Sequence, residues 1–241
     1  MVPPPGYVAY GGDTRMVGPI SPVAGVAKSL VALQAISVVT GLILLGFQVS
    51  LVQRAKDFLG GDISQSDFRD RLGPFFAVSL VAGLVSLAVL VLSIIWSFRI
   101  AKNLQGLGRP ITWKPGLTIV VWIAGGCTLS IINFLMLREH WKASDPEVAP
   151  RDPSYTTRPV SPLIVGWFVL SLAQVVLSGA SGARSFSGVN VGTGTEKVAR
   201  TLSDRLGLVI GSGLCGLAAT VVLILIVRQL TARHLRAVGE A

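Results

Sequence analysis

The chain has 241 residues, of which 51% are hydrophobic and only 14% are charged, and its mean hydropathy is +0.66. These values exclude an ordinary soluble domain. The formal charge of +9 does not indicate a nucleic-acid-binding protein, because the basic residues are spread through the chain and form no single stripe. Anionic lipid headgroups are the expected counter-charge for these basic loops.

The first 28 residues are rich in proline and glycine. A segment of this composition buries too little apolar surface to offset its chain entropy. We therefore expect residues 1–28 to form a disordered, flexible N-terminal tail. We expect a transmembrane helical domain over residues 29–230 and a short basic C-terminal tail over residues 231–241.

Five stretches of the helical domain contain no Asp, Glu, Lys or Arg. They are residues 29–53, 73–98, 115–137, 159–183 and 206–227, with lengths of 25, 26, 23, 25 and 22 residues. Each is long enough to cross a hydrocarbon core of roughly 30 Å as a helix, and none alternates as a barrel strand does. The sequence predicts an all-α integral membrane bundle of four to five transmembrane helices.

The third stretch, 115–137, leaves two arrangements open. If all five stretches cross, the two sides carry 10 and 11 basic residues, which sets no orientation. If the third stretch enters and leaves by the same face, the counts are 13 and 8, which favours cytoplasmic termini. Gly125 and Gly126 offer a breaking point for such a re-entrant segment. They would equally allow a neighbouring helix to pack closely against an ordinary crossing.

Few residues suggest chemistry. No charged side chain lies within the apolar stretches, and His140 and His234 lie near helix ends without a catalytic or metal-binding motif. Cys127 and Cys215 lack the spacing of metal ligands. We therefore expect no enzyme activity, no cofactor and no metal.

Two groups of residues are candidate sites. The amides of Asn133 and Gln174 could line a cavity beside the break at Gly125 and Gly126, although interhelical hydrogen bonding is the usual role of such amides. The second group is a cytoplasmic patch of polar and aromatic side chains: Trp96, Arg99, Asn103, Trp113, Trp141 and Ser144. Trp96, Arg99 and Asn103 share a helix face because they are spaced i, i+3 and i+7.

The region 96–146 also carries a recognisable order of motifs. They are W-x-x-R-x-x-x-N from Trp96, Leu107-Gly108, Trp113-x-Pro115-Gly116, an apolar segment with Trp122, and Trp141-Lys142-Ala143-Ser144-Asp145-Pro146. This order resembles the bacterial, largely actinobacterial, membrane proteins of domain of unknown function 4328. The resemblance implies a bacterial cytoplasmic membrane location and implies no activity.

Two functions remain open from the sequence. The first is a structural or interaction membrane protein whose 96–146 region forms a cytoplasmic surface for a protein partner of unknown identity. The alternative is a small transporter or channel-like protein with a re-entrant third segment around Gly125 and Gly126. Neither function involves nucleic acid.

Overall fold

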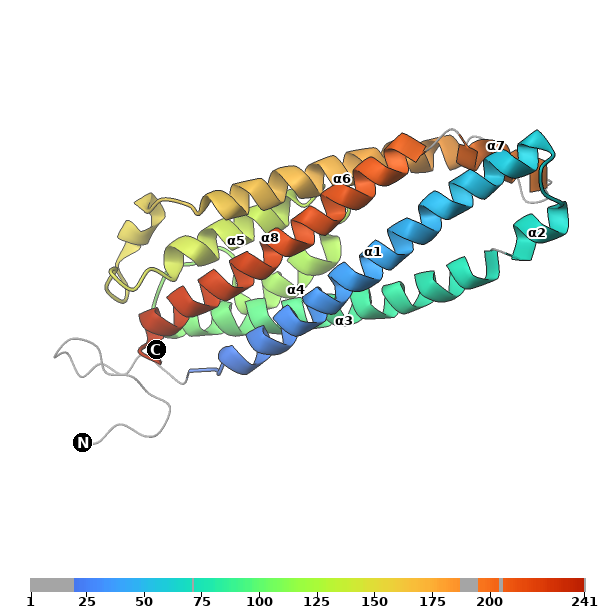
Figure 1. Cartoon of the computed structure of the whole chain (residues 1–241). Coiled ribbons are helices and arrows are strands. Elements are labelled where there is room, and N and C mark those ends of the chain that lie inside the picture. Colours follow the sequence, from blue (N-terminus) through green and yellow to red (C-terminus); the bar gives the residue numbers. More distant parts are fainter. Residues whose placement is uncertain (1–19, 71, 187–194, 204–205, 241) are drawn as a thin grey trace. The chain divides into compact units, whose positions relative to one another are not determined.

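The computed structural model describes residues 20–70, 72–186, 195–203 and 206–240, and these ranges contain helices and turns without a strand. The elements in chain order are α1 (Ala24–Gly60), α2 (Gln65–Asp70), α3 (Leu72–Gly106), α4 (Pro115–Ala124), α5 (Ile131–Ala143), the 3-10 helix η1 (Pro153–Thr157), α6 (Pro162–Phe186), α7 (Thr195–Ser203) and α8 (Leu206–Val238) (Figure 1).

Among the described residues, four helices are long and apolar enough to cross a membrane, namely α1, α3, α6 and α8. Their apolar side chains are largely exposed, as a hydrocarbon surrounding requires. The predicted all-α bundle is confirmed, with four candidate crossings. Helix α4 has only ten residues, which span about 15 Å and therefore about half of a hydrocarbon core.

The ends of the chain differ from the expected tails. Residues 1–19 of the predicted N-terminal tail lie outside the described residues, and α1 already begins at Ala24. At the other end α8 continues to Val238, and Thr231 and His234 are buried. The stretch 231–238 is therefore packed helix, because its polar side chains find partners inside the protein.

The chain divides into two compact units, which we describe separately. Unit one comprises Met1–Gln34, Ala88–Phe168 and Val222–Ala241, and unit two comprises Ala35–Leu87 and Val169–Val221. Unit one contains α4 and α5, and unit two contains α2 and α7.

In unit one, the third apolar stretch is a helical hairpin. The chain turns between α4 and α5 through Leu129 and Ser130, which have φ values of 50° and 62°. The Glu139 carboxylate near the end of α5 accepts hydrogen bonds from the backbone N–H groups of Thr112 and Trp113, just before α4, at 2.8 and 2.9 Å. The chain thus enters and leaves the hairpin at the same end, as in the re-entrant alternative.

Two adjacent glycines at this turn have different surroundings. A Cβ atom at Gly125 would collide with the side-chain amide of Asn133, whereas a Cβ atom at Gly126 would meet nothing within 4 Å. Gly125 therefore allows α5 to approach the end of α4 closely. Of the two arrangements left open by the sequence, the one with a break at Gly125 and Gly126 matches the end of α4 at Ala124.

In unit two, glycines of α8 allow close packing within the chain. A Cβ atom at Gly213 would lie 2.7 Å from Leu45 of α1, and one at Gly216 would lie 2.8 Å from the Gln174 amide of α6. Such approaches let dispersion contacts form between helices that have no hydrophobic driving force in lipid.

The α2 end of unit two is closed by an apolar cluster. Leu51 and Ala55 of α1 pack with Phe68 of α2 and Ala199 of α7, and the rings of Phe58 and Phe68 stack at 5.5 Å. Helix α7 is held against α1 and α2 by its buried Ala199.

Replacement of Gly125 by alanine should destabilise the hairpin, because the new methyl group must displace Asn133. We expect a loss of about 1–3 kcal/mol and a lower melting temperature in detergent. Gly126→Ala is the matched control and should change stability by less than about 1 kcal/mol. Equal melting temperatures for the two variants would contradict this packing role.

Candidate functional site

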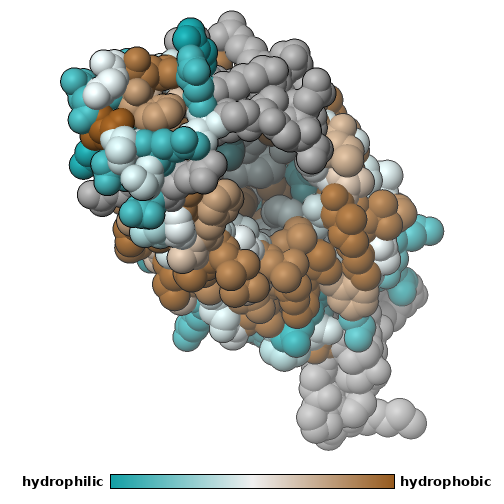
Figure 2. Space-filling model, turned by 90° about the vertical axis from the view of Figure 1, so that its right-hand side faces the viewer, coloured by the Kyte–Doolittle hydropathy of each residue, from teal (hydrophilic) through white to brown (hydrophobic). Residues whose placement is uncertain are grey.

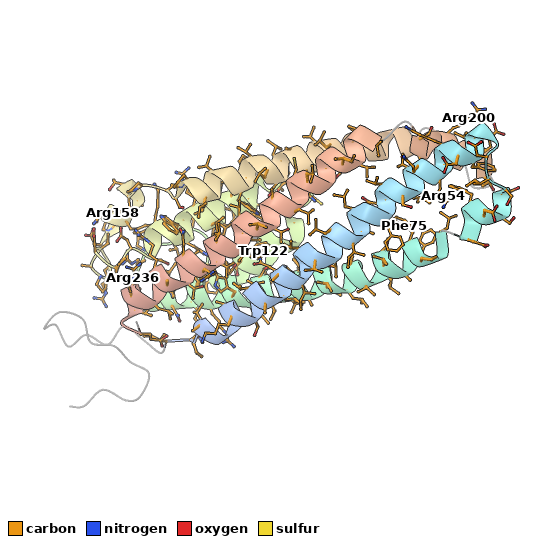
Figure 3. The ribbon with its side chains drawn as sticks, viewed as in Figure 1. Arg54, Phe75, Trp122, Arg158, Arg200 and Arg236 are labelled. Carbon is orange, nitrogen blue, oxygen red and sulfur yellow. The ribbon has the colours of Figure 1, made fainter. Side chains whose placement is uncertain are left out.

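Buried polar side chains gather at one end of unit one, where α1 begins and α8 ends. They come from the last turns of α3, from α5 and the connection after it, and from the last turns of α8. The fully or nearly fully buried members are Asn103, Arg109, His140, Ser144, Asp145 and His234. Figure 3 labels Arg158 and Arg236, which lie at this end.

Asn103 connects α3 to the segment that precedes α1. Its Oδ1 atom accepts a hydrogen bond from the backbone N–H of Ser21 at 2.8 Å, and its Nδ2 atom donates to the Ser21 carbonyl at 3.0 Å. The same Nδ2 atom lies 3.1 Å from Nε2 of His234. The two bonds to Ser21 fix the orientation of the Asn103 amide. Only this orientation gives the Ser21 N–H an acceptor and the Ser21 carbonyl a donor.

The amide orientation determines the tautomer of His234. Nδ2 of Asn103 has only hydrogens to offer, so Nε2 of His234 must accept, and the ring proton of the neutral imidazole resides on Nδ1. Nδ1 lies 3.1 Å from the Ser144 hydroxyl oxygen, which therefore accepts from His234. An imidazole that donates to a hydroxyl oxygen cannot remove the proton from it, so in this polarity His234 is not placed to act as a base toward Ser144. We call Ser21, Asn103, Ser144 and His234 the terminal network.

Two further bonds extend this packing. The indole N–H of Trp96 donates to the Thr231 hydroxyl at 3.0 Å, joining α3 to α8. The Arg99 guanidinium donates to the Pro22 carbonyl at 2.6 Å. The chain leading into α1 is therefore held by α3 at two consecutive residues, Ser21 and Pro22.

An ionic cluster of Asp145, Arg158 and Arg233 lies beside the terminal network. The nearly buried Asp145 carboxylate lies 2.8 Å from the Arg233 guanidinium and 3.3 Å from that of Arg158. Arg233 also lies 5.1 Å from the centroid of the Trp141 ring. One carboxylate thus ties the C-terminal helix to both ends of the connection between α5 and α6, and its loss would leave two partly buried cations unpaired.

Arg109 organises the first part of that connection. It donates to the carbonyl groups of Asp145 and Val148 at 3.0 and 2.7 Å. The backbone N–H of Arg151 donates to the Leu107 carbonyl at 3.1 Å. These bonds attach a segment without regular secondary structure to the end of α3.

His140 is completely buried in α5. Burial lowers the pKa of its imidazole to about 4, and the Glu139 carboxylate and the backbone of Trp113 oppose the shift only in part. Neither ring nitrogen makes a hydrogen bond of ordinary geometry to a described residue. His140 therefore stays neutral while the protein is folded near neutral pH.

The six residues of the predicted patch do not form one exposed surface. Trp96, Asn103 and Ser144 are 0%, 2% and 0% exposed, because each has its polar atom bonded to a neighbouring helix or segment. The remaining three are partly buried: Arg99, Trp113 and Trp141. The exposed face of this end is formed by their neighbours in the connection after α5.

The residues of the predicted cavity fall into different units. Asn133 of unit one is 3% exposed and packs against Gly125. Gln174 belongs to unit two, where its amide lies against Gly216.

The sequence reasoning did not assign roles to His234, Asp145, Arg233 or Glu139. His234 and Arg233 follow the last apolar stretch by only a few residues, and Thr231 and His234 lie at i and i+3 on one face of α8. This spacing could have predicted that the helix continues past the apolar stretch and packs its polar face against the protein. The partners of Asp145 and Glu139 depend on the folding of the hairpin, which no local pattern reveals.

Among the described residues, no group of three or more His, Cys, Asp or Glu side chains could hold a metal ion. Cys127 and Cys215 are both free. The contacts described above bind helices and segments of unit one to one another.

Comparison with protein families gives one match. The family described as Domain of unknown function (DUF4328) matches residues 62–232, which is more than half of the chain and includes all of α3, the hairpin, all of α6 and most of α8. The chain belongs to this family. Neither the curated proteins nor the solved structures include a match to this DUF4328 protein.

Substitution of Asn103 should release the segment before α1 in this DUF4328 member. Asn103→Ala leaves Ser21 and His234 without their partners, and each unpaired buried group costs about 1–3 kcal/mol. We expect faster hydrogen exchange in residues 20–24 and a lower melting temperature. Lys102→Ala, at the exposed neighbouring position, should change neither. Unchanged hydrogen exchange of residues 20–24 in Asn103→Ala would contradict the role of Asn103 in holding Ser21.

The pKa of His140 predicts acid sensitivity. Between pH about 6.5 and 4 the unfolded chain binds a proton at this residue and the folded chain does not, so stability falls as the pH is lowered. At pH 5 the buried neutral His140 lowers the free energy of unfolding by about 2 kcal/mol relative to pH 7. Melting temperatures at pH 7 and pH 5 should differ less in His140→Asn than in the wild type. Equal differences would contradict a buried neutral His140.

Proposed function

We propose that this protein is a multi-pass interaction protein of the bacterial cytoplasmic membrane, and that its unit-one end docks a protein partner on the cytoplasmic side. The observation that carries the proposal is the ionic cluster. The double pairing of Asp145 with Arg158 and Arg233 fastens both ends of the connection between α5 and α6 to the C-terminal helix. A rigid surface binds a partner at a lower entropic cost than a flexible one.

The surface itself is charged and exposed. Glu147 has a side chain that is 75% exposed and lies 3.4 Å from Arg158, which is itself 37% exposed. Lys142 donates to the Thr156 carbonyl at 2.7 Å, which fixes a second cation at the edge. A partner with both acidic and basic groups would complement this surface, and anionic lipid headgroups would bind its basic rim.

A non-enzymatic role is supported by the terminal network. The Ser144 hydroxyl accepts from His234, so the chain's Ser–His pair has the wrong polarity for nucleophilic catalysis. The bonds of Asn103 to Ser21 hold that polarity in place.

Cytoplasmic termini are supported by the hairpin. When the third apolar stretch enters and leaves at one end, the side with both termini carries 13 of the 21 basic residues. The positive-inside bias then places this side in the cytoplasm. The matching family is a domain of unknown function, so the orientation in the membrane is argued from the charge distribution.

A small transporter or channel-like protein is the second candidate. It is favoured by Asn133, whose buried Oδ1 atom has no hydrogen-bond partner among the described residues. An unbonded amide oxygen in an apolar surrounding costs several kcal/mol (roughly 2–7), and water in a cavity beside the hairpin turn would remove that cost.

The docking proposal is tested with a photoreactive amino acid at position 147. We expect a discrete covalent adduct in cells, because position 147 lies on the docking surface. The adduct should disappear when Asp145→Asn loosens the connection. The same probe at Leu80, which is 67% exposed on α3, is the control and should give no such adduct. An adduct pattern that is the same at both positions, or unaffected by Asp145→Asn, would contradict the proposal.

The transport candidate has a separate test. Flux of a broad panel of solutes into proteoliposomes should equal flux into empty vesicles if the docking proposal is right. Flux above that level in the wild type and not in Asn133→Leu would replace docking by transport.

A further inference from the structure

Unit two contains two hollows along the same pair of helices. A pocket of about 460 Å³ is lined by Arg54, Ile63, Asp67, Asp70 and Pro74. A groove of about 260 Å³ is lined by Thr40 and Ile43 of α1 and by Ala77, Val78 and Val81 of α3. In Figure 3, Arg54 lies near the end of α1 that leads to α2, close to the start of α3.

The pocket lies at the level where the apolar stretches end. Arg54 is the first charged residue after the stretch 29–53, and Asp70 lies three residues before the stretch 73–98. Such residues mark the boundary between hydrocarbon and water. Figure 2, which faces this end of the molecule, shows hydrophilic residues gathered at one corner beside a band of hydrophobic ones.

The groove lies below the pocket on the same helix faces. Thr40, Ile43 and Arg54 are spaced i, i+3 and i+14, so they share a face of α1, and Pro74, Ala77 and Val81 share a face of α3. Ile43 lies about 16 Å from Arg54 along α1, which is about the depth of one leaflet of the hydrocarbon core.

The groove is apolar. The Thr40 hydroxyl is bonded to backbone carbonyls of its own helix, at 3.0 Å to that of Ile36 and 3.2 Å to that of Ser37. The flanking side chains are exposed hydrophobic groups such as Leu80, at 67%. A groove of this kind within the bilayer accommodates a hydrocarbon chain.

The pocket combines a cation with two carboxylates. Within the described part of the chain, Arg54 makes no hydrogen bond or ion pair. The Oδ2 atom of Asp67 accepts hydrogen bonds from the backbone N–H and the hydroxyl of Ser64, and the Oδ1 atom can accept from a ligand. Asp70 is exposed. The lining therefore offers the Arg54 donors for a phosphate and the two carboxylates as acceptors for an ammonium group. Because carboxylates outnumber the cation, the negative net charge of the lining disfavours a headgroup that is only anionic.

We propose that unit two binds one aminophospholipid, with its phosphoethanolamine headgroup in the pocket and an acyl chain in the groove between α1 and α3. Arg54 binds the phosphate, and Asp67 and Asp70 bind the ammonium group. The acyl chain covers apolar side chains of α1 and α3 that no other part of unit two buries. This site is separate from the docking surface of unit one.

The test reconstitutes the full chain into vesicles with equal parts of phosphatidylethanolamine, phosphatidylglycerol and phosphatidylcholine. Lipid retained after extraction in a mild detergent is then identified by native mass spectrometry. We expect the wild type to retain phosphatidylethanolamine about fivefold over the other two, the ratio that one exposed charge pair provides. Equal retention of the three lipids, or a preference for phosphatidylglycerol, would overturn the proposal.

Variants separate the two parts of the site. Ala77→Trp fills the groove and should abolish retention, whereas Leu84→Trp, at an exposed α3 position outside the lining, should preserve it. Asp70→Asn should lower the preference for phosphatidylethanolamine over phosphatidylcholine and leave the fold intact. Equal retention in both tryptophan variants would overturn the proposal, and if Ala77→Trp fails to fold, the wild-type ratio and Asp70→Asn decide alone.

Discussion

A hydrocarbon solvent satisfies no hydrogen bond, and this constraint governs where polar groups lie in the molecule. Backbone groups are paired within helices that are long and apolar enough to cross a membrane. Side-chain chemistry is displaced toward the helix ends, where Asn103, Ser144 and His234 meet in unit one. Dispersion packing joins the helices between these ends, as at Gly213 against Leu45.

The hairpin of α4 and α5 shows how a non-crossing segment meets the same constraint. Its turn exposes backbone groups that a continuous helix would pair, and the local bonds of the turn, such as that of the Ser130 N–H to the Gly125 carbonyl at 2.8 Å, recover part of that pairing. Glu139 then satisfies two N–H groups before α4. Half-length helices are tolerated here because backbone bonds pair groups at the turn and the Glu139 carboxylate pairs groups before α4.

The sequence predicted the parts of this fold that depend on composition alone. Absence of charge located the long helices, whereas the paired glycines left a break and an ordinary crossing equally open, and α4 in fact ends at Ala124. The patch around Trp96 was predicted as a surface, yet Asn103 and Ser144 are interior. Their burial depends on His234, which is about 90 residues or more away from either partner in the chain, and helical periodicity carries no information over such separations.

The Ser, His and Asn side chains of the terminal network form a series of hydrogen bonds with a defined polarity. The peptide of Ser21 orients the Asn103 amide, the amide makes Nε2 of His234 an acceptor, and the Nδ1 proton then points to Ser144. Each bond in this series constrains the next, so the segment before α1 determines the proton position on a ring of α8. The same four residues that would make a nucleophile in the opposite polarity instead join the beginning, middle and end of the chain, and the order of donors and acceptors makes the difference.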